Sequence, residues 1–89
     1  MTLNDEEIAA QLPEEWDRED DEIVRTYEFD DYLTGVDFAA DIAEIADEAF
    51  HHPEIIIGFR SVEVRLTNHE AGGITEIDID LAEQFDDEF

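Results

Sequence analysis

The net charge of this chain constrains its fold more than any other feature. Among 89 residues, 28 are Asp or Glu, four are Arg and none is Lys, which gives a formal net charge of −24. Self-repulsion of this size opposes compaction and is typical of disordered chains. However, 43% of the residues are hydrophobic and only two are proline, and the hydrophobic residues recur at regular periods. We therefore expect one folded domain over residues 1–89, small enough to gain from self-association.

The same charge argues against several classes of function. So acidic a chain cannot neutralise phosphates, so we expect neither a nucleic-acid partner nor binding to an anionic membrane. No apolar run approaches the roughly 18 residues that span a bilayer, and the N-terminus lacks the basic region of a secretory signal, so we expect a cytoplasmic protein. The lack of cysteine excludes disulfides and thiolate chemistry. The absence of Lys beside so many carboxylates indicates adaptation to concentrated salt, where charge repulsion is screened.

Hydrophobic periodicity and capping signals predict the secondary structure. The expected elements are a helix between Asn4 and Pro13, a strand over 23–29, a helix over 32–50, strands over 55–60 and 61–67, and a helix after Thr75. Helices separated by antiparallel strands are typical of an α+β fold with the helices on one face of a sheet. The exposed edge strands of so small a sheet are a second reason to expect an oligomer.

The last helix has clear local signals. Thr75 is a strong N-cap, and Asp78 occupies the position that completes a capping box. Ile77, Leu81 and Phe85 follow at intervals of four residues, and we expect them to form the buried stripe of this helix.

All three histidines fall at predicted element boundaries. His51 and His52 follow the long helix, and His69 follows the last strand. Pro53 disfavours a helical backbone at His52, so the two adjacent rings should point in different directions. Asp47 lies one helical turn before His51 and can keep one of its ring nitrogens protonated. Helix and strand ends can converge in such a fold, so the three imidazoles could share a cleft and transfer protons there.

Two other interpretations remain open on the residues alone. Three histidines in 89 residues are ordinary usage, and surface or core positions account for them without any catalysis. A zinc site is the more specific alternative, because His51, His52, His69 and Glu54 offer enough ligands. Adjacent histidines seldom bind one ion, however, and the chain has no H-x-H or H-x-x-x-H spacing, so we expect no metal.

Two segments of the chain resemble the signature of a known family. They are His51-His52-Pro53-Glu54 and Thr67-Asn68-His69-Glu70-Ala71-Gly72-Gly73-Ile74-Thr75, the second followed by Asp78. The pattern is similar to that of the pterin-4a-carbinolamine dehydratase family, in which His-His-Pro-Asp/Glu precedes Thr-x-His-x-x-Gly-Gly-Leu-Thr-x-x-Asp. The similarity covers nearly the whole chain, including Leu12, Pro13 and Trp16 and the strand residues Arg25, Tyr27 and Phe29.

This resemblance implies both a fold and a reaction. The fold is a four-stranded antiparallel sheet with three helices packed on one face, assembled into homodimers or homotetramers. The reaction is loss of water from 4a-hydroxytetrahydropterin to give quinonoid dihydropterin, for recycling after aromatic amino acid hydroxylation, with no cofactor. The three family histidines map onto His51, His52 and His69. We expect His51 and His69 to form the acid/base pair, and His52 to bind or orient the pterin.

The resemblance also implies supporting residues. Asp47 stands where the family has a carboxylate, usually Glu, that holds the first histidine. Asp78 matches the family Asp, Glu54 belongs to the first signature, and Trp16 is either a wall of the site or a structural anchor. Two alternative functions stay open: a non-enzymatic dimerisation cofactor of a transcription factor, and a pterin-binding role in molybdopterin metabolism.

Overall fold

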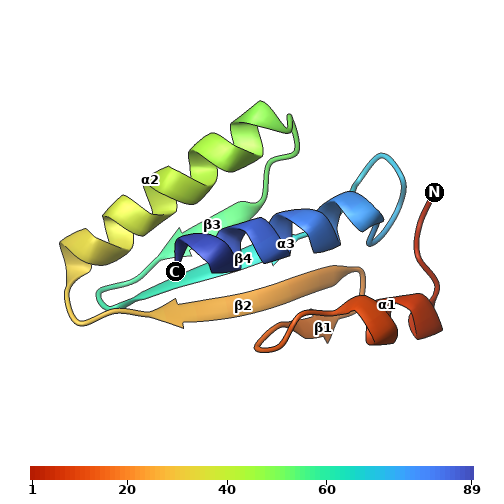
Figure 1. Ribbon diagram of the computed structural model, residues 1–89, viewed down its shortest axis with the longest axis horizontal. Helices are drawn as coiled ribbons and strands as arrows, with labels where there is room; N and C mark the ends of the chain where they lie inside the picture. Colours follow the sequence, from red (N-terminus) through yellow and green to blue (C-terminus); the bar gives the residue numbers. More distant parts are fainter.

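Seven elements make up the computed structural model, which describes all residues from Met1 to Phe89. They are α1 (Asp5–Gln11), β1 (Asp17–Glu19), β2 (Glu22–Glu28), α2 (Tyr32–Glu48), β3 (Glu54–Ile57), β4 (Ser61–Leu66) and α3 (Glu76–Glu88). The strands form one antiparallel sheet in the order β1-β2-β4-β3. Helices α2 and α3 lie together over the sheet, and α1 lies beside β1 at its edge (Figure 1). The α+β fold with three helices and four antiparallel strands is therefore confirmed.

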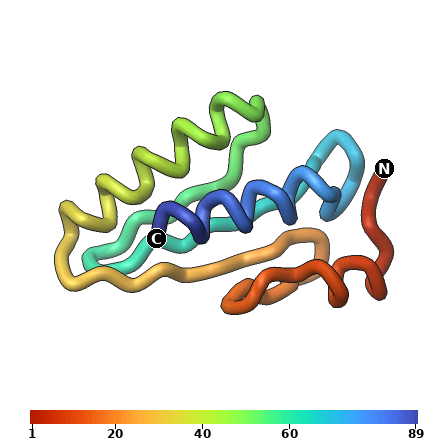
Figure 2. Tube along the Cα trace, viewed as in Figure 1, coloured from red at the N-terminus to blue at the C-terminus, as the bar shows by residue number.

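The capping signals that start the first helix are present in the structure. The side chain of Asn4 accepts a hydrogen bond from the Glu7 N–H at 2.8 Å, and the Glu7 carboxylate accepts from the Asn4 N–H at 2.9 Å. Ahead of this helix, the Leu3 N–H donates to the Ile74 carbonyl at 2.8 Å. This bond ties the start of the chain to the segment before α3, as the trace in Figure 2 shows.

The sheet contains one strand that periodicity did not place. Strand β1 lies inside the polar connection over 14–22, and all three of its residues are exposed. Asp17 pairs with Val24, and a two-residue turn that begins with Asp20 returns the chain into β2. Asp20 has a positive φ of 54°, a conformation that Asp tolerates better than most residues. Because β1 buries no face, it leaves no hydrophobic alternation in the sequence.

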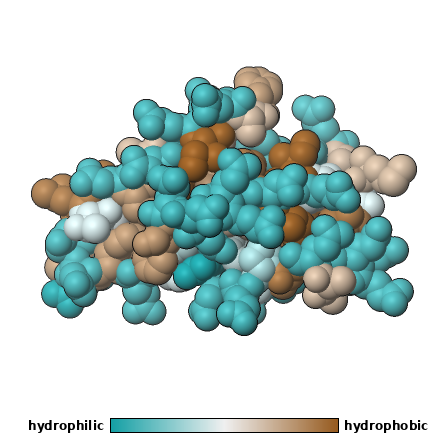
Figure 3. All heavy atoms as spheres, viewed as in Figure 1, coloured by the Kyte–Doolittle hydropathy of each residue, from teal (hydrophilic) through white to brown (hydrophobic).

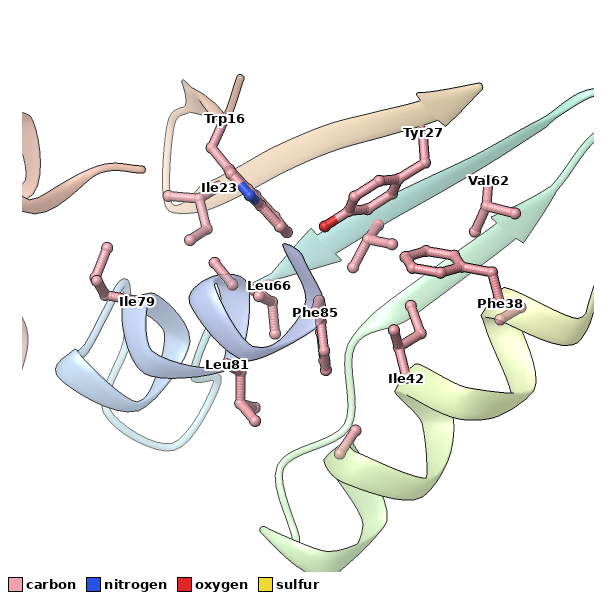
Figure 4. Close-up of a cluster of buried hydrophobic side chains, with 14 of the residues drawn as sticks. Trp16, Ile23, Tyr27, Phe38, Ile42, Val62, Leu66, Ile79, Leu81 and Phe85 are labelled. Atoms are coloured by element: carbon pink, nitrogen blue, oxygen red, sulfur yellow. The ribbon is translucent and has the colours of Figure 1, made fainter. Parts of the chain in front are cut away.

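One hydrophobic core joins the sheet to the two long helices. Figure 4 shows this cluster, to which β2, β4, α2 and α3 contribute the labelled residues Ile23, Tyr27, Val62, Leu66, Phe38, Ile42, Leu81 and Phe85. The expectation that Ile77 belongs to the buried stripe was wrong, since Ile77 is 47% exposed. The capping box turns Asp78 inward, and residues one apart on a helix differ by about 100°. Ile79 and Ala82 take the buried places instead.

A carboxylate near the C-terminus accepts hydrogen bonds from three side chains at the edge of this core. Asp86 of α3 accepts hydrogen bonds from the Trp16 indole at 3.0 Å, from Arg25 at 2.8 Å and from the Tyr27 hydroxyl at 2.6 Å. The Phe89 ring packs 5.1 Å from the Tyr27 ring, centroid to centroid. Arg25, the one charged residue on the inward face of β2, thus finds its partner 61 positions later in the sequence, on α3.

The acidic surface predicts how stability depends on salt. The face in Figure 3 is mostly hydrophilic, with separate hydrophobic patches. Because only four Arg offset the 28 carboxylates and leave a net charge of −24, we expect the melting temperature to fall when salt is diluted from about 2 M to about 0.1 M, where the Debye length grows to ~10 Å. Thermal unfolding followed by circular dichroism measures this, with sucrose at matched osmolality as the uncharged control. An unchanged melting temperature would contradict the salt adaptation.

No helix of the structure is both long enough and apolar enough to cross a bilayer.

Candidate functional site

The two adjacent histidines diverge because the chain reverses at Phe50. This residue has a left-handed φ of 50° just after α2. Its N–H donates to the Asp47 carbonyl and the His51 N–H donates to the Ala46 carbonyl, both at 3.0 Å. Together these two bonds form a Schellman motif, whose left-handed position is usually glycine. The reversal takes His51 off the helical face on which Asp47 lies.

Each of the two histidines therefore has its own carboxylate. His51 Nε2 lies 2.5 Å from Asp78 Oδ1, and His52 Nε2 lies 3.0 Å from Asp47 Oδ1. The expectation that Asp47 would hold His51 was wrong, because helical spacing does not continue through the turn at Phe50. The structure pairs Asp47 with the second histidine, and it pairs the first with a residue of α3.

Asp78 combines a structural bond with a contact to His51. The carboxylate is fully buried. Its Oδ2 accepts from the Thr75 N–H at 2.8 Å and from the Thr75 hydroxyl at 3.2 Å, which leaves Oδ1 for His51. The His51 side chain is 14% exposed. A neutral imidazole that donates from Nε2 to Asp78 keeps Nδ1 as an acceptor, so this contact selects a tautomer able to take up a proton.

A cleft at one end of the sheet collects the other predicted site residues. Strands β2 and β3 begin there and β4 ends there, as the antiparallel register requires. The cleft has a volume of about 430 Å³. Its lining residues are Glu22, His52, Pro53, Glu54, Arg65, Thr67 and His69. His52, His69 and Glu54, which come from separate parts of the sequence, thus meet in one place.

His51 faces a neighbouring hollow. This hollow has a volume of about 460 Å³ and includes Phe50, His51, Asn68 and Glu70 in its lining. His69, between the last two, lines the cleft described above. The loop at 68–70 therefore borders both the hollow that His51 lines and the cleft that His52 and His69 line.

Trp16 lies outside this site. Its side chain is 3% exposed and belongs to the hydrophobic core, with its ring 6.3 Å from the Tyr27 ring in an edge-to-face arrangement. It is not among the residues that line the cleft. The structure thus places it as an anchor of the polar connection rather than as a wall of the site.

The ligands considered for zinc are not assembled as a metal site. No group of three His, Asp or Glu side chains in the structure lies close enough together to hold an ion.

Sequence reasoning missed two residues of the cleft. Arg65 alternates outward on β4, and Glu22 ends the polar connection, so both looked like ordinary solvated charges. The hydrogen bonds that Arg65 donates to Glu63 and then to Glu19 raise the pKa of Arg65 further above its usual range, which keeps it a cation. The signal available in the sequence was Arg65 itself, a lone cation near the end of the strand that leads to His69.

These features define a class: a small α+β domain with imidazoles and paired carboxylates at one end of its sheet. The family described as pterin 4 alpha carbinolamine dehydratase matches residues 1–88, and the chain belongs to this family.

The relatives include proteins from halophilic archaea. A protein of Natronomonas pharaonis, named as a candidate pterin-4-alpha-carbinolamine dehydratase, is 66% identical over 85 residues, which cover 96% of this chain and 92% of the relative. A relative of the same name from Haloarcula marismortui is 61% identical over 82 residues, covering 92% of this chain and 89% of the relative. These sources agree with the salt adaptation inferred from the charge.

A solved structure shares the whole fold. The crystal structure of a transcriptional coactivator/pterin dehydratase from Brucella melitensis is similar, with a TM-score of 0.94 and 29% sequence identity. The similarity covers 99% of this chain and 98% of the other.

Proposed function

We propose that this protein is a hydro-lyase that dehydrates 4a-hydroxytetrahydropterin to quinonoid dihydropterin, with His51, His52 and His69 as its catalytic residues. The observation that carries the proposal is the meeting of His52, His69 and Glu54 in one cleft, beside a third histidine held by a buried carboxylate. Membership of the family supplies the substrate class.

The reaction needs two proton transfers and no change of redox state. The bond between C4a and the hydroxyl oxygen breaks, and an imidazolium gives that oxygen a proton so that it leaves as water. A neutral imidazole takes the proton of the neighbouring ring N–H, whose electrons form the new C4a–N double bond. In the proposal His51 and His69 are this acid/base pair, since a tautomer fixed by Asp78 suits His51 to proton transfer.

The remaining site residues have supporting roles in the proposal. His52, which lines the cleft and contacts Asp47, binds or orients the pterin. Glu54 lines the same cleft, and Asp78 positions His51. No metal or organic cofactor takes part, and the enzyme serves tetrahydropterin recycling in the cytoplasm. It works as a homodimer or homotetramer, and the exposed Ile56 and Ile57 on the edge strand β3 support an assembly of copies.

A direct assay tests the proposed function. The 4a-hydroxypterin is generated in situ at high salt, and its dehydration is compared for wild type, His51→Ala and His69→Ala. We expect each substitution to lower the rate by about 10²- to 10⁴-fold, the usual contribution of acid/base catalysis. Glu83→Ala, at an exposed position of α3 that lines neither the cleft nor the hollow, is the control and should keep its activity.

Two results would count against the proposal in different ways. Full activity in both histidine variants would refute the acid/base assignment and leave the dehydratase reaction standing. A wild type that gave no acceleration over buffer would refute the enzyme itself. That outcome would favour one of the alternatives, an interaction module like the coactivator named for the Brucella structure or a pterin-binding role in molybdopterin metabolism.

A further inference from the structure

Two charged residues of the cleft have no part in the proposed proton transfers. Glu22 and Arg65 lie on β2 and β4 and line the cleft together with His52 and His69. We propose that this pair recognises the pyrimidinone edge of the pterin, with Glu22 accepting from its two N–H groups and Arg65 donating to its carbonyl oxygen. The inference rests on the proposed function and names the residues that select the substrate.

The guanidinium of Arg65 is held in place by three carboxylates. Its Nε donates to Glu63 Oε2 at 2.7 Å, and its Nη1 donates to Glu19 Oε1 at 3.1 Å and to Glu22 Oε1 at 3.2 Å. None of the hydrogen bonds within the chain uses Arg65 Nη2 or Glu22 Oε2. Both side chains are also largely shielded, at 23% and 34% exposed. A donor and an acceptor are therefore left side by side, on side chains that are already ordered.

This arrangement complements one edge of a pterin. The pyrimidinone ring presents an exocyclic amino group, a ring N–H and a carbonyl oxygen in a row: two donors and then an acceptor. An ionised carboxylate only accepts and can take both N–H groups, while a guanidinium only donates. Glu22 and Arg65 offer these groups in the complementary order, and charge-assisted bonds of this kind are stronger than those between neutral partners.

The orientation that follows brings the reacting atom toward His52 and His69. C4a is bonded directly to the carbonyl carbon, so a ring held by Arg65 at its carbonyl oxygen presents C4a beside that contact. His52 and His69 line the rest of the cleft. Its volume of about 430 Å³ falls within the roughly 300–1,000 Å³ of small-molecule sites.

Glu19 provides a matched control within the same cluster. It contacts the same nitrogen of Arg65 as Glu22 does, at nearly the same distance. Glu19 is not among the residues that line the cleft. If Glu22 served only to neutralise Arg65, substitution of either glutamate would have the same consequence. If Glu22 binds the ring, only its own substitution changes the selection of ligands.

The test compares two ligands that differ at the recognised edge. Binding of 6-methyl-7,8-dihydropterin and of 6-methyl-7,8-dihydrolumazine, which has a carbonyl in place of the amino group, is measured by calorimetry at high salt. The wild type should prefer the pterin. In Glu22→Gln we expect this preference to shrink by about tenfold, the order of one charged hydrogen bond, while Glu19→Gln keeps it. Melting temperatures of both variants show that the fold is retained.

The possible failures are distinguishable from one another. An unchanged preference in Glu22→Gln, or an equal loss in Glu19→Gln, would overturn the recognition role while the dehydratase assay still stood. A wild type that bound neither ligand and dehydrated no substrate would overturn the proposed function and this inference with it.

Discussion

Replacing Asp86 with Ala should cost about 3 kcal/mol of unfolding free energy, because three donors lose their acceptor at once and each unsatisfied buried polar group costs ~1–3 kcal/mol. The donors are the indole of Trp16, the guanidinium of Arg25 and the hydroxyl of Tyr27. For a domain of this size, a loss of that order lowers the melting temperature by roughly 12–24 °C. Chemical denaturation at fixed high salt measures the effect.

The neighbouring Asp87 provides the control for this substitution. Asp87 is exposed and takes part in none of these bonds, so Asp87→Ala removes the same charge without orphaning a donor. If Asp86→Ala were no less stable than Asp87→Ala, the hydrogen bonds to Asp86 would not hold α3 to the sheet.

The hydrogen bond between Tyr27 and Asp86 also makes the free energy of unfolding depend on pH in the alkaline range. Burial, followed by the hydrogen bond to Asp86 and the charge of Asp86, raises the pKa of Tyr27 well above its ordinary value. The folded state therefore keeps a proton that the unfolded chain releases above pH ~10, so stability is fully present below that pH and falls as the pH rises. Tyr27→Phe should lose this dependence above pH ~10, and parallel curves for the two proteins would contradict the shift.

Asp78→Asn should lower the rate of the proposed dehydration by roughly 10²-fold, a typical effect of losing the partner that orients a catalytic histidine. Asn has one acceptor oxygen, and its amide nitrogen only donates. It therefore cannot serve both Thr75 and His51 as the carboxylate does. Asp80→Asn, at an exposed position of the same helix, is the control and should leave the rate unchanged.

A double variant separates positioning from general damage. If Asp78 acts through His51, combining Asp78→Asn with His51→Ala should slow the reaction no more than His51→Ala alone, because coupled residues are non-additive. Additive losses would show that Asp78 acts through the fold or through another group.

Features fixed by neighbouring residues could be predicted from the sequence. The cap of α1 and the β3–β4 hairpin each depend on residues a few positions apart, and the structure contains both. Strand β1 was missed because its exposed residues carry no periodicity. Its place follows instead from a tight turn and from the register with β2.

The partners of charged groups were harder to predict, for two physical reasons. Asp86 binds residues that lie 59 to 70 positions away, and no local pattern indicates such bonds. The pairing of Asp47 depends on Phe50, whose left-handed backbone is unusual for a bulky residue and breaks the helical spacing. The sequence thus indicated which residues share the end of the sheet, whereas the pairs they form there depend on one backbone reversal.

That reversal links the geometry of the site to the packing between two helices. His51 and His52 are adjacent in the chain, yet the carboxylate of one belongs to α3 and that of the other to α2. A sliding of α3 along α2 would therefore pull the two imidazoles by different amounts and in different directions. Ala46 of α2 and Ala82 of α3 are both buried in the core that these helices share, so neither position has room for a larger side chain without a shift of its helix. A larger side chain at either alanine should therefore change the spacing of the two histidine rings.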